Sequence, residues 1–270
     1  MNLPRLIVSD LDGTLLPECK VLPRHTRQVL GRLADMGVVI ALASGKFFHL
    51  TWEYAQLLGP GTVAIALDGA RFGYAPGNGS SNGIPREVAL SILDAHDAPH
   101  LEMFADNGAD EMLLRFRTPR VPESIQNWAS RIHRVDDARP LLVGDPALVA
   151  FYGEHWAEMR EIAQATESAH PTLRAAVFVA SSYGTARVVI QQRDITKGSG
   201  VLELCRHFGF APRECMVFGD WYNDLPLFSA GCTNVAMINA VPELQAQAHH
   251  LTERDNEAEG VAHFLAARFL

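Results

Sequence analysis

An excess of positive charge is missing from this sequence. Its 270 residues include 23 Lys and Arg but 31 Asp and Glu, which gives a formal net charge of -8. Nucleic-acid binding depends on basic side chains that neutralise backbone phosphates, so no nucleic-acid partner is expected. An anionic ligand would have to be attracted by positive charge at one place rather than by the protein as a whole.

Long apolar stretches are missing as well. No run approaches the roughly 20 residues that a membrane-spanning helix needs. The first apolar run, Leu6–Val8, ends at Ser9 and Asp10, which makes it too short for a secretory signal peptide. We therefore expect a cytoplasmic protein with no membrane partner.

Cysteine is scarce and lacks the CxxC spacing that is typical of zinc sites. The sequence has four cysteines, which are Cys19, Cys205, Cys215 and Cys232. We predict that they are free thiols, the usual state in a reducing cytosol. Hydrophobic residues make up 48% of the chain, so disorder is not expected. The length suffices for one large domain or two smaller ones.

Short apolar runs alternate with helical patterns near both ends of the chain. Val38–Ala43 and Val63–Leu67 are too short and too uniformly apolar for surface helices, so they predict buried parallel strands. Val29 and Leu33 recur at helical spacing, and Gly37 predicts the end of that helix. Alternating strands and helices indicate βαβ units, a parallel sheet and hence an α/β fold.

Two carboxylates follow the first predicted strand. Asp10 and Asp12 precede Gly13, which lets the backbone turn away close to a bound group. Two neighbouring carboxylates repel each other, and desolvation increases the repulsion, so a cation between them is expected. A hard ion that prefers oxygen ligands fits best. The sequence therefore predicts a Mg²⁺ site at this strand end.

Three further segments place polar residues after predicted strands or at a helix start. Ser44-Gly45-Lys46 follows the second strand, Thr196-Lys197-Gly198 opens a helical pattern, and Gly219-Asp220-Trp221-Tyr222-Asn223-Asp224 follows Met216–Phe218. In a parallel sheet the carboxyl ends of the strands face one crevice, so these residues should converge there. In this order the four segments resemble the four motifs of the haloacid dehalogenase-like phosphohydrolases, most closely those of the Cof-type branch (class IIB).

This resemblance implies a fold, a cofactor and a mechanism. The fold would be α/β, with a Rossmann-like parallel-sheet core and an inserted α+β cap domain, and the cofactor would be Mg²⁺. Asp10 would be the nucleophile that forms an aspartyl-phosphate, and Asp12 the general acid and base. The metal ligands would be Asp10, Asp220 and the backbone carbonyl of Asp12. The phosphate-binding residues would be Ser44, Gly45, Lys197 and Asn223, with support from Asp224, Lys46 and Asp68.

Three of these positions depart from the usual Cof-type pattern. Ser44 stands where threonine is usual, which preserves the hydroxyl. Lys46 replaces arginine, which keeps the charge but loses the bidentate fork. Asp68 replaces asparagine, which adds negative charge near an anion site and would suit a substrate with a hydroxyl or a cation nearby.

The middle of the chain breaks the alternation of strand and helix. A cluster of Gly, Ser and Asn at 77–83 predicts turn or hinge material. Val177–Ala180 and Arg187–Ile190 predict paired strands around a turn at 182–184. We therefore predict a catalytic core at 1–83 and 188–270, with a cap at 84–187 that determines substrate selectivity.

The predicted function is Mg²⁺-dependent hydrolysis of small phosphorylated metabolites, such as sugar phosphates or phosphorylated cofactors. A phosphomutase or phosphotransferase of the same superfamily is one alternative, although it typically has a longer glycine-rich insertion before the final Asn-Asp pair. A non-catalytic module that binds phosphometabolites is another, disfavoured because Asp10 and Asp12 are both present. An EF-hand fails on spacing, since its sixth position would be Leu15 and not glycine. No feature of the sequence predicts an oligomeric state.

Overall fold

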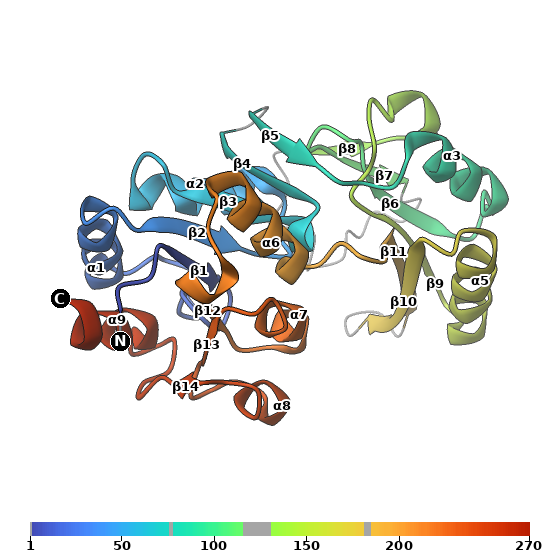
Figure 1. Cartoon of the computed structure of the whole chain (residues 1–270). Coiled ribbons are helices and arrows are strands. Elements are labelled where there is room, and N and C mark those ends of the chain that lie inside the picture. Colours follow the sequence, from blue (N-terminus) through green and yellow to red (C-terminus); the bar gives the residue numbers. More distant parts are fainter. Residues whose placement is uncertain (1, 76–77, 116–130, 181–184) are drawn as a thin grey trace. The chain divides into compact units, whose positions relative to one another are not determined.

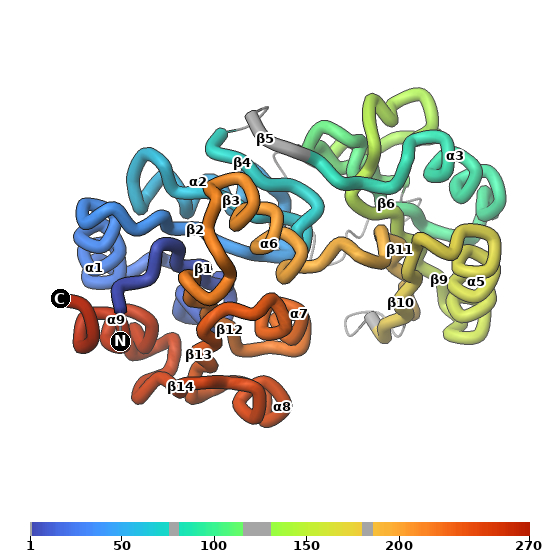
Figure 2. Tube along the Cα trace, in the orientation of Figure 1, coloured from blue at the N-terminus to red at the C-terminus, as the bar shows by residue number. Residues whose placement is uncertain are grey.

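Two sheets organise the computed structural model, which describes residues 2–75, 78–115, 131–180 and 185–270. The chain divides into two compact units. Unit 1 combines residues 1–80 with 195–270, and unit 2 comprises residues 81–194. Unit 1 is therefore built from both ends of the chain, and in Figure 2 its blue and its red segments lie side by side.

The sheet of unit 1 has the order β14-β13-β12-β1-β2-β3-β4-β5 (Figure 1). The pairs from β14 to β3 are parallel, and β4 is antiparallel to β3. Its strands are β1 (Leu6–Asp10), β2 (Val39–Ala43), β3 (Val63–Ala66), β4 (Arg71–Ala75), β5 (Asn78–Ser81), β12 (Cys215–Gly219), β13 (Thr233–Ala236) and β14 (His250–Leu251). All five residues of both β1 and β12 are buried, as expected of central parallel strands covered on both faces.

Helices connect and cover these strands. The helices of unit 1 are α1 (Arg24–Asp35), α2 (Phe48–Leu58), α6 (Lys197–Phe208), α7 (Leu225–Phe228), α8 (Pro242–Gln245) and α9 (Gly260–Phe269). Short 3-10 turns form η1 (Leu67–Gly69), η4 (Pro212–Glu214) and η5 (Tyr222–Asp224). In α1 the apolar face of Val29, Leu30 and Leu33 is buried, and burying each such side chain contributes about 1.5–3 kcal/mol.

Unit 2 is an α+β unit with its own sheet and its own apolar core. The sheet order is β10-β11-β9-β6-β7-β8. Its strands are β6 (Glu102–Asp106), β7 (Met112–Arg115), β8 (Ile132–Arg134), β9 (Val149–Gly153), β10 (Leu173–Ala180) and β11 (Thr185–Gln192). Its described helices are α3 (Arg86–Ala95), α5 (Trp156–Ala169) and the 3-10 turn η3 (Arg139–Leu141). The predicted architecture, a Rossmann-like core with an inserted α+β unit, is confirmed.

Local predictions for the inserted region met different outcomes. The paired strands were correct, because β10 and β11 run antiparallel with Val177 opposite Val188. The turn predicted at 182–184 lies outside the described residues. The turn or hinge predicted at 77–83 was wrong for 78–81, which form β5 beside β4. Pairing with a neighbouring strand outweighs the low strand preference of Gly, Ser and Asn there.

The unit boundaries differ slightly from the expected ones. The predicted core resumes at residue 188, but that position lies inside β11, which pairs with β9 and β10 of unit 2. The first segment of unit 1 ends at residue 80, three positions before the predicted boundary. Among the described residues, no helix combines the length and the apolar character that crossing a membrane requires.

Candidate active site

Neighbouring strand ends bring the predicted site residues together. The strand β1 lies between β12 and β2, with Asp10 opposite Ala43 and Ser9 opposite Phe218. The residues that follow β2 and β12 are Ser44 and, after Gly219, Asp220. The chain runs outward from β1 in two opposite directions across the sheet, so this edge is the topological switch point at which ligands of α/β sheets bind.

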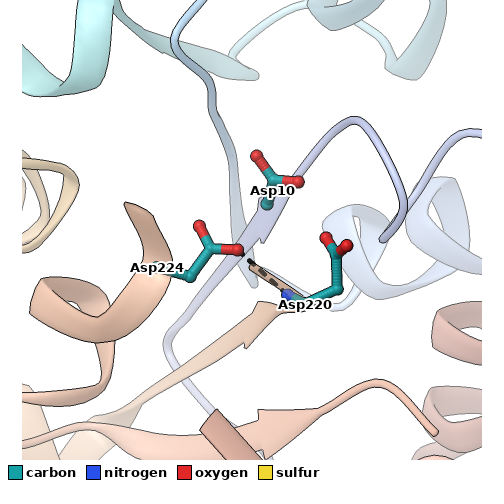
Figure 3. Close-up of side chains that lie close together, drawn as sticks. All are labelled: Asp10, Asp220 and Asp224. Carbon is teal, nitrogen blue, oxygen red and sulfur yellow. Dashed lines mark hydrogen bonds between the residues drawn. The ribbon is translucent and has the colours of Figure 1, made fainter. Parts of the chain in front are cut away.

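Three carboxylates form the centre of this site (Figure 3). Asp10 ends β1, Asp220 follows β12, and Asp224 ends the turn η5. One oxygen from each lies within 4.8 Å of the others, and all three residues are buried. Buried carboxylates this close repel one another strongly unless positive charge lies among them.

Lys197 supplies one such charge. It is the first residue of α6, after a reciprocal capping pair in which Thr196 Oγ1 accepts from Ser199 N–H and Ser199 Oγ accepts from Thr196 N–H. Its Nζ donates to Asp10 Oδ1 at 2.6 Å and to Asp224 Oδ1 at 2.7 Å, and its side chain is completely buried. The capping pair therefore fixes where the helix begins, and with it the position of this ammonium.

Asp224 is held in place on both of its oxygens. While Oδ1 accepts from Lys197, Oδ2 accepts from the backbone N–H groups of Asp220 at 2.9 Å and Trp221 at 3.1 Å. A carboxylate with this many donors is rigid and well satisfied. Asp224 therefore acts as a brace for Asp220 and Lys197, with Asp10 and Asp220 freer to bind a ligand.

The turn after β1 positions Asp220. Thr14 Oγ1 donates to Asp220 Oδ1 at 2.6 Å, and Gly13 passes so close that a Cβ there would lie 2.3 Å from Asp220 Oδ2. Gly13 also has a φ of +81°, which favours glycine. Asn239 secures the same turn by donating to Gly13 O at 2.9 Å.

Burial shifts the protonation of these groups. Burial raises the pKa of Asp10 to about 7, against the opposing charge of Lys197. Burial also raises the pKa of Asp220, with the Thr14 hydrogen bond opposing it and the Asp224 charge adding to it. Although burial disfavours the charged form of Lys197, the carboxylates of Asp10 and Asp224 hold its pKa above the ordinary value. Burial lowers the pKa of Lys46.

Asp12 lies apart from the three-carboxylate cluster and is paired with two lysines. Lys46 Nζ contacts Asp12 Oδ2, and Lys20 Nζ lies 2.7 Å from Asp12 Oδ1. The Asp12 side chain is 37% exposed. Its side chain therefore faces more open surroundings than Asp10, which suits a group that exchanges protons with a leaving group or water.

The loops after β2 and β3 are tied together beside the cluster. Lys46 N–H donates to Ser44 Oγ at 3.2 Å, and Asp68 N–H donates to Ser44 O at 3.1 Å. Leu67, Asp68 and Gly69 all have positive φ, and Gly69 passes so close to Thr196 O that no Cβ would fit. The strained turn thereby joins the Ser44 loop to the start of α6.

Asp68 and Asn223 face each other within this arrangement. Asn223 Nδ2 donates to Asp68 Oδ1 at 3.3 Å, although Asn223 is exposed. A Cβ on Gly45 would lie 3.4 Å from the Asp68 carboxylate. The unusual aspartate therefore lies directly against the loop predicted to bind phosphate, with the Asn223 amide as its partner.

The donor set fits a divalent cation. Three carboxylates and one ammonium leave the buried cluster with two uncompensated negative charges, the number that one Mg²⁺ neutralises. All donors are oxygens, which hard cations prefer. Asp10 and Asp220 would provide the carboxylate ligands.

Comparison with known proteins agrees with this arrangement. The family model described as haloacid dehalogenase-like hydrolase matches residues 7–265. The chain belongs to the haloacid dehalogenase-like hydrolases. It is 25% identical over 273 residues to the 5-amino-6-(5-phospho-D-ribitylamino)uracil phosphatase YitU of Bacillus subtilis, covering 98% of both chains. It is 28% identical over 267 residues to the HMP-PP phosphatase of Serratia proteamaculans, covering 97% of this chain and 94% of that one.

Solved structures show the same fold at lower identity. A haloacid dehalogenase-like hydrolase from Bacteroides thetaiotaomicron matches with a TM-score of 0.81 and 22% identity, covering 98% of this chain and all of that one. Another from B. subtilis matches with a TM-score of 0.75 and 18% identity at similar coverage, 98% and 100%. The family predicted from the four motifs is confirmed, and so is the predicted enzyme class, a phosphoric monoester hydrolase.

Sequence reasoning missed two residues of this site. Thr14 could have been suspected, because it follows the acidic pair within the same turn. Lys20 carries no motif signal, and only the folded turn brings it to Asp12. All the predicted site residues lie on unit 1. Asp10 ends β1, and the others lie on the loops that follow β1, β2, β3 and β12 or at the start of α6.

Proposed function

We propose that this haloacid dehalogenase-like hydrolase is a Mg²⁺-dependent phosphatase of small phosphorylated metabolites that works through an aspartyl-phosphate on Asp10. The observation that carries the proposal is the buried cluster of Asp10, Asp220 and Asp224 around Lys197. The phosphatase activities named for the relatives support the reaction class.

The metal would be held by Asp10, Asp220 and the backbone carbonyl of Asp12. When bound, Mg²⁺ supplies positive charge that reduces repulsion between a carboxylate nucleophile and an anionic phosphate. The residues around it keep its ligands in position. Thr14 orients the Asp220 side chain by donating to its Oδ1, and Asp224 holds the Asp220 backbone by accepting from its N–H.

The first step would transfer the phosphoryl group to the protein. A carboxylate oxygen of Asp10 attacks phosphorus, and the bond between phosphorus and the leaving oxygen breaks as Asp12 gives that oxygen a proton. Lys197 and the amides of the Ser44–Gly45 loop would neutralise and orient the transferring oxygens. Asn223 would contact the same group, and Lys46 and Asp68 would shape the surrounding charge.

The second step would release phosphate. Asp12, now ionised, accepts a proton from a water molecule. The oxygen of that water attacks phosphorus, and the bond between phosphorus and Asp10 breaks. Inorganic phosphate leaves, and Asp10 returns to a carboxylate. The two ammonium groups beside Asp12 would stabilise its ionised form between the steps.

Unit 2 would select the leaving group. The residues of unit 1 described above would account for the nucleophile, the metal and the phosphate, and the α+β unit at residues 81–194 would contribute further contacts to the rest of the substrate. The relatives are named for a phosphorylated ribitylaminouracil and for HMP-PP, so small phosphorylated metabolites of this kind are the first compounds to test.

Phosphate release from a panel of phosphomonoesters, with Mg²⁺ or with EDTA, tests the proposal. We expect turnover only with Mg²⁺, and its loss in Asp10→Asn and Asp10→Ala. Asp35→Asn, at the exposed end of α1, is the matched control and should keep full activity. Activity in Asp10→Ala, or covalent phosphate on a residue other than Asp10 after rapid quenching, would refute the mechanism. Transfer to an added alcohol in preference to water would indicate a phosphotransferase instead.

A further inference from the structure

Lysine is used sparingly in this chain, and always at the candidate active site. Of the 23 Lys and Arg residues only Lys20, Lys46 and Lys197 are lysines. Lys197 pairs with Asp10 and Asp224, and the other two pair with Asp12. All three lysines therefore form ion pairs with aspartates of the candidate active site.

Arginine forms ion pairs in other parts of the chain, such as Arg139 with Asp94 and Arg206 with Glu203. A guanidinium is broad and planar and binds carboxylates side-on, whereas an ammonium is a compact charge on a flexible stem. The three lysines therefore place compact positive charges at the candidate active site. Lys20 belongs to this group although none of the four motifs contains it.

The backbone around Lys20 is shaped to direct its side chain. Lys20 has a φ of +58°, which is uncommon for a residue with a Cβ and is maintained only where surrounding contacts require it. Its N–H donates to Pro17 O at 2.9 Å, and Tyr54 Oη donates to Lys20 O at 2.9 Å. These two hydrogen bonds hold the turn in the conformation that brings Nζ to 2.7 Å from Asp12 Oδ1.

Stability does not account for this arrangement. The side chains of Lys20 and Asp12 are 51% and 37% exposed, and ion pairs with this exposure contribute little to folding. Lys46 already pairs with the other oxygen of Asp12. A second lysine at the same carboxylate leaves one positive charge in excess at the residue proposed to contact the leaving oxygen.

We propose that Lys20 is an active-site residue that, with Lys46, selects phosphomonoesters whose leaving group carries a second negative charge. The inference rests on the proposed function, because it takes Asp12 to be the group nearest the leaving oxygen. With Asp12 beside the leaving oxygen, an ammonium 2.7 Å from Asp12 Oδ1 would be closer to that oxygen than the Debye length, which is about 8 Å at physiological salt. Its attraction for an anionic leaving group would therefore be only partly screened. The second charge could belong to a carboxylate or to a further phosphate.

Matched substrate pairs separate these two sources. 3-Phosphoglycerate and glycerol 3-phosphate differ in one carboxylate, and fructose 1,6-bisphosphate and fructose 6-phosphate, which are both phosphomonoesters, differ in whether the leaving group carries a further phosphate. We expect kcat/KM to favour the charged member of at least one pair, mainly through KM. Lys20→Gln should lower that preference about tenfold, while Lys20→Arg, which keeps the charge, should keep it within about threefold of the parent. Added salt should weaken the preference of the parent more than that of Lys20→Gln.

Arg24→Gln is the control, because it removes an exposed positive charge four residues away at the start of α1. An unchanged preference in Lys20→Gln, or an equal loss in Arg24→Gln, would overturn the inference. Turnover of glycerol 3-phosphate tests the proposed function separately. Titration calorimetry of the same esters with Asp10→Asn protein, with and without Lys20→Gln, gives the comparison without turnover. If both proteins bound the charged esters with equal affinity, the inference would also be overturned.

Discussion

Gly13 offers a quantitative test of how the turn after β1 positions Asp220. Gly13→Ala would place a Cβ 2.3 Å from Asp220 Oδ2 and would also put an alanine at a φ of +81°. The conformational penalty alone is about 1–2 kcal/mol. The contact cannot be relieved without moving the Asp220 carboxylate, which Thr14 holds at 2.6 Å.

Two other glycines separate these effects. Gly37 has a φ of +89°, and no described atom would lie within 4 Å of its Cβ, so Gly37→Ala measures the backbone penalty alone. Gly31 lies inside α1 with an ordinary φ and similar open space, so Gly31→Ala should stabilise the protein by about 0.5–1 kcal/mol. We expect Gly37→Ala to destabilise by about 1–2 kcal/mol and Gly13→Ala by at least as much.

The metal titration is the decisive measurement. Displacing Asp220 in Gly13→Ala should raise the Mg²⁺ concentration needed for half-maximal activity about 10–100-fold. Gly37→Ala and Gly31→Ala should leave that concentration unchanged. Urea unfolding and Mg²⁺ titration of the three variants provide both sets of values. If Gly13→Ala matched Gly37→Ala in both, the close approach of Gly13 to Asp220 would not control the metal site, and the reasoning would be refuted.

Three further predictions concern the buried charges. Thr14→Val removes the hydroxyl that donates to Asp220, so we expect the free energy of unfolding, measured in urea, to fall by about 1–3 kcal/mol. The Mg²⁺ concentration needed for half-maximal activity should rise, and an unchanged concentration would contradict this prediction. Lys197→Met leaves the carboxylates unbalanced, and we expect about 3–5 kcal/mol of destabilisation, measured with EDTA present; a neutral result would show that the cluster holds protons instead. The pKa of Asp10 is raised from 3.8 to about 7, so between these pH values Asp10 keeps its proton in the folded metal-free protein but has lost it in the unfolded chain. Stability should therefore fall between about pH 4 and pH 7 relative to Asp10→Asn, and parallel pH curves for the two proteins in EDTA would exclude that shift.

The architecture, and the gathering of the predicted residues at one candidate site, could be predicted from the sequence because both follow from local patterns. Parallel strands that are buried on both faces appear as short apolar runs, and their carboxyl ends meet at one edge of the sheet. Asp10, Ser44 and Asp220 could therefore be assigned to one place from their positions after such runs. The register confirms that β1, β2 and β12 are neighbours.

Tertiary structure decided how these groups pair with one another. Asp10 and Lys197 are 187 residues apart, and Thr14 and Asp220 are 206 apart, so no local pattern links them. Whether a carboxylate binds a ligand or braces a neighbour depends on which donors reach each oxygen. Asp224 is a brace because its carboxylate already accepts hydrogen bonds from two backbone N–H groups and one ammonium.

The same reason explains the remaining differences. The segment 78–81 became a strand because β4 provides a pairing edge, a property of the neighbour rather than of its own Gly and Ser residues. Lys20 reaches Asp12 because a turn with positive φ, secured by a hydroxyl from α2, directs its side chain there. Apolar periodicity and motif spacing record which residues are buried and where strands end, whereas contacts between loops are fixed only when the whole sheet has assembled.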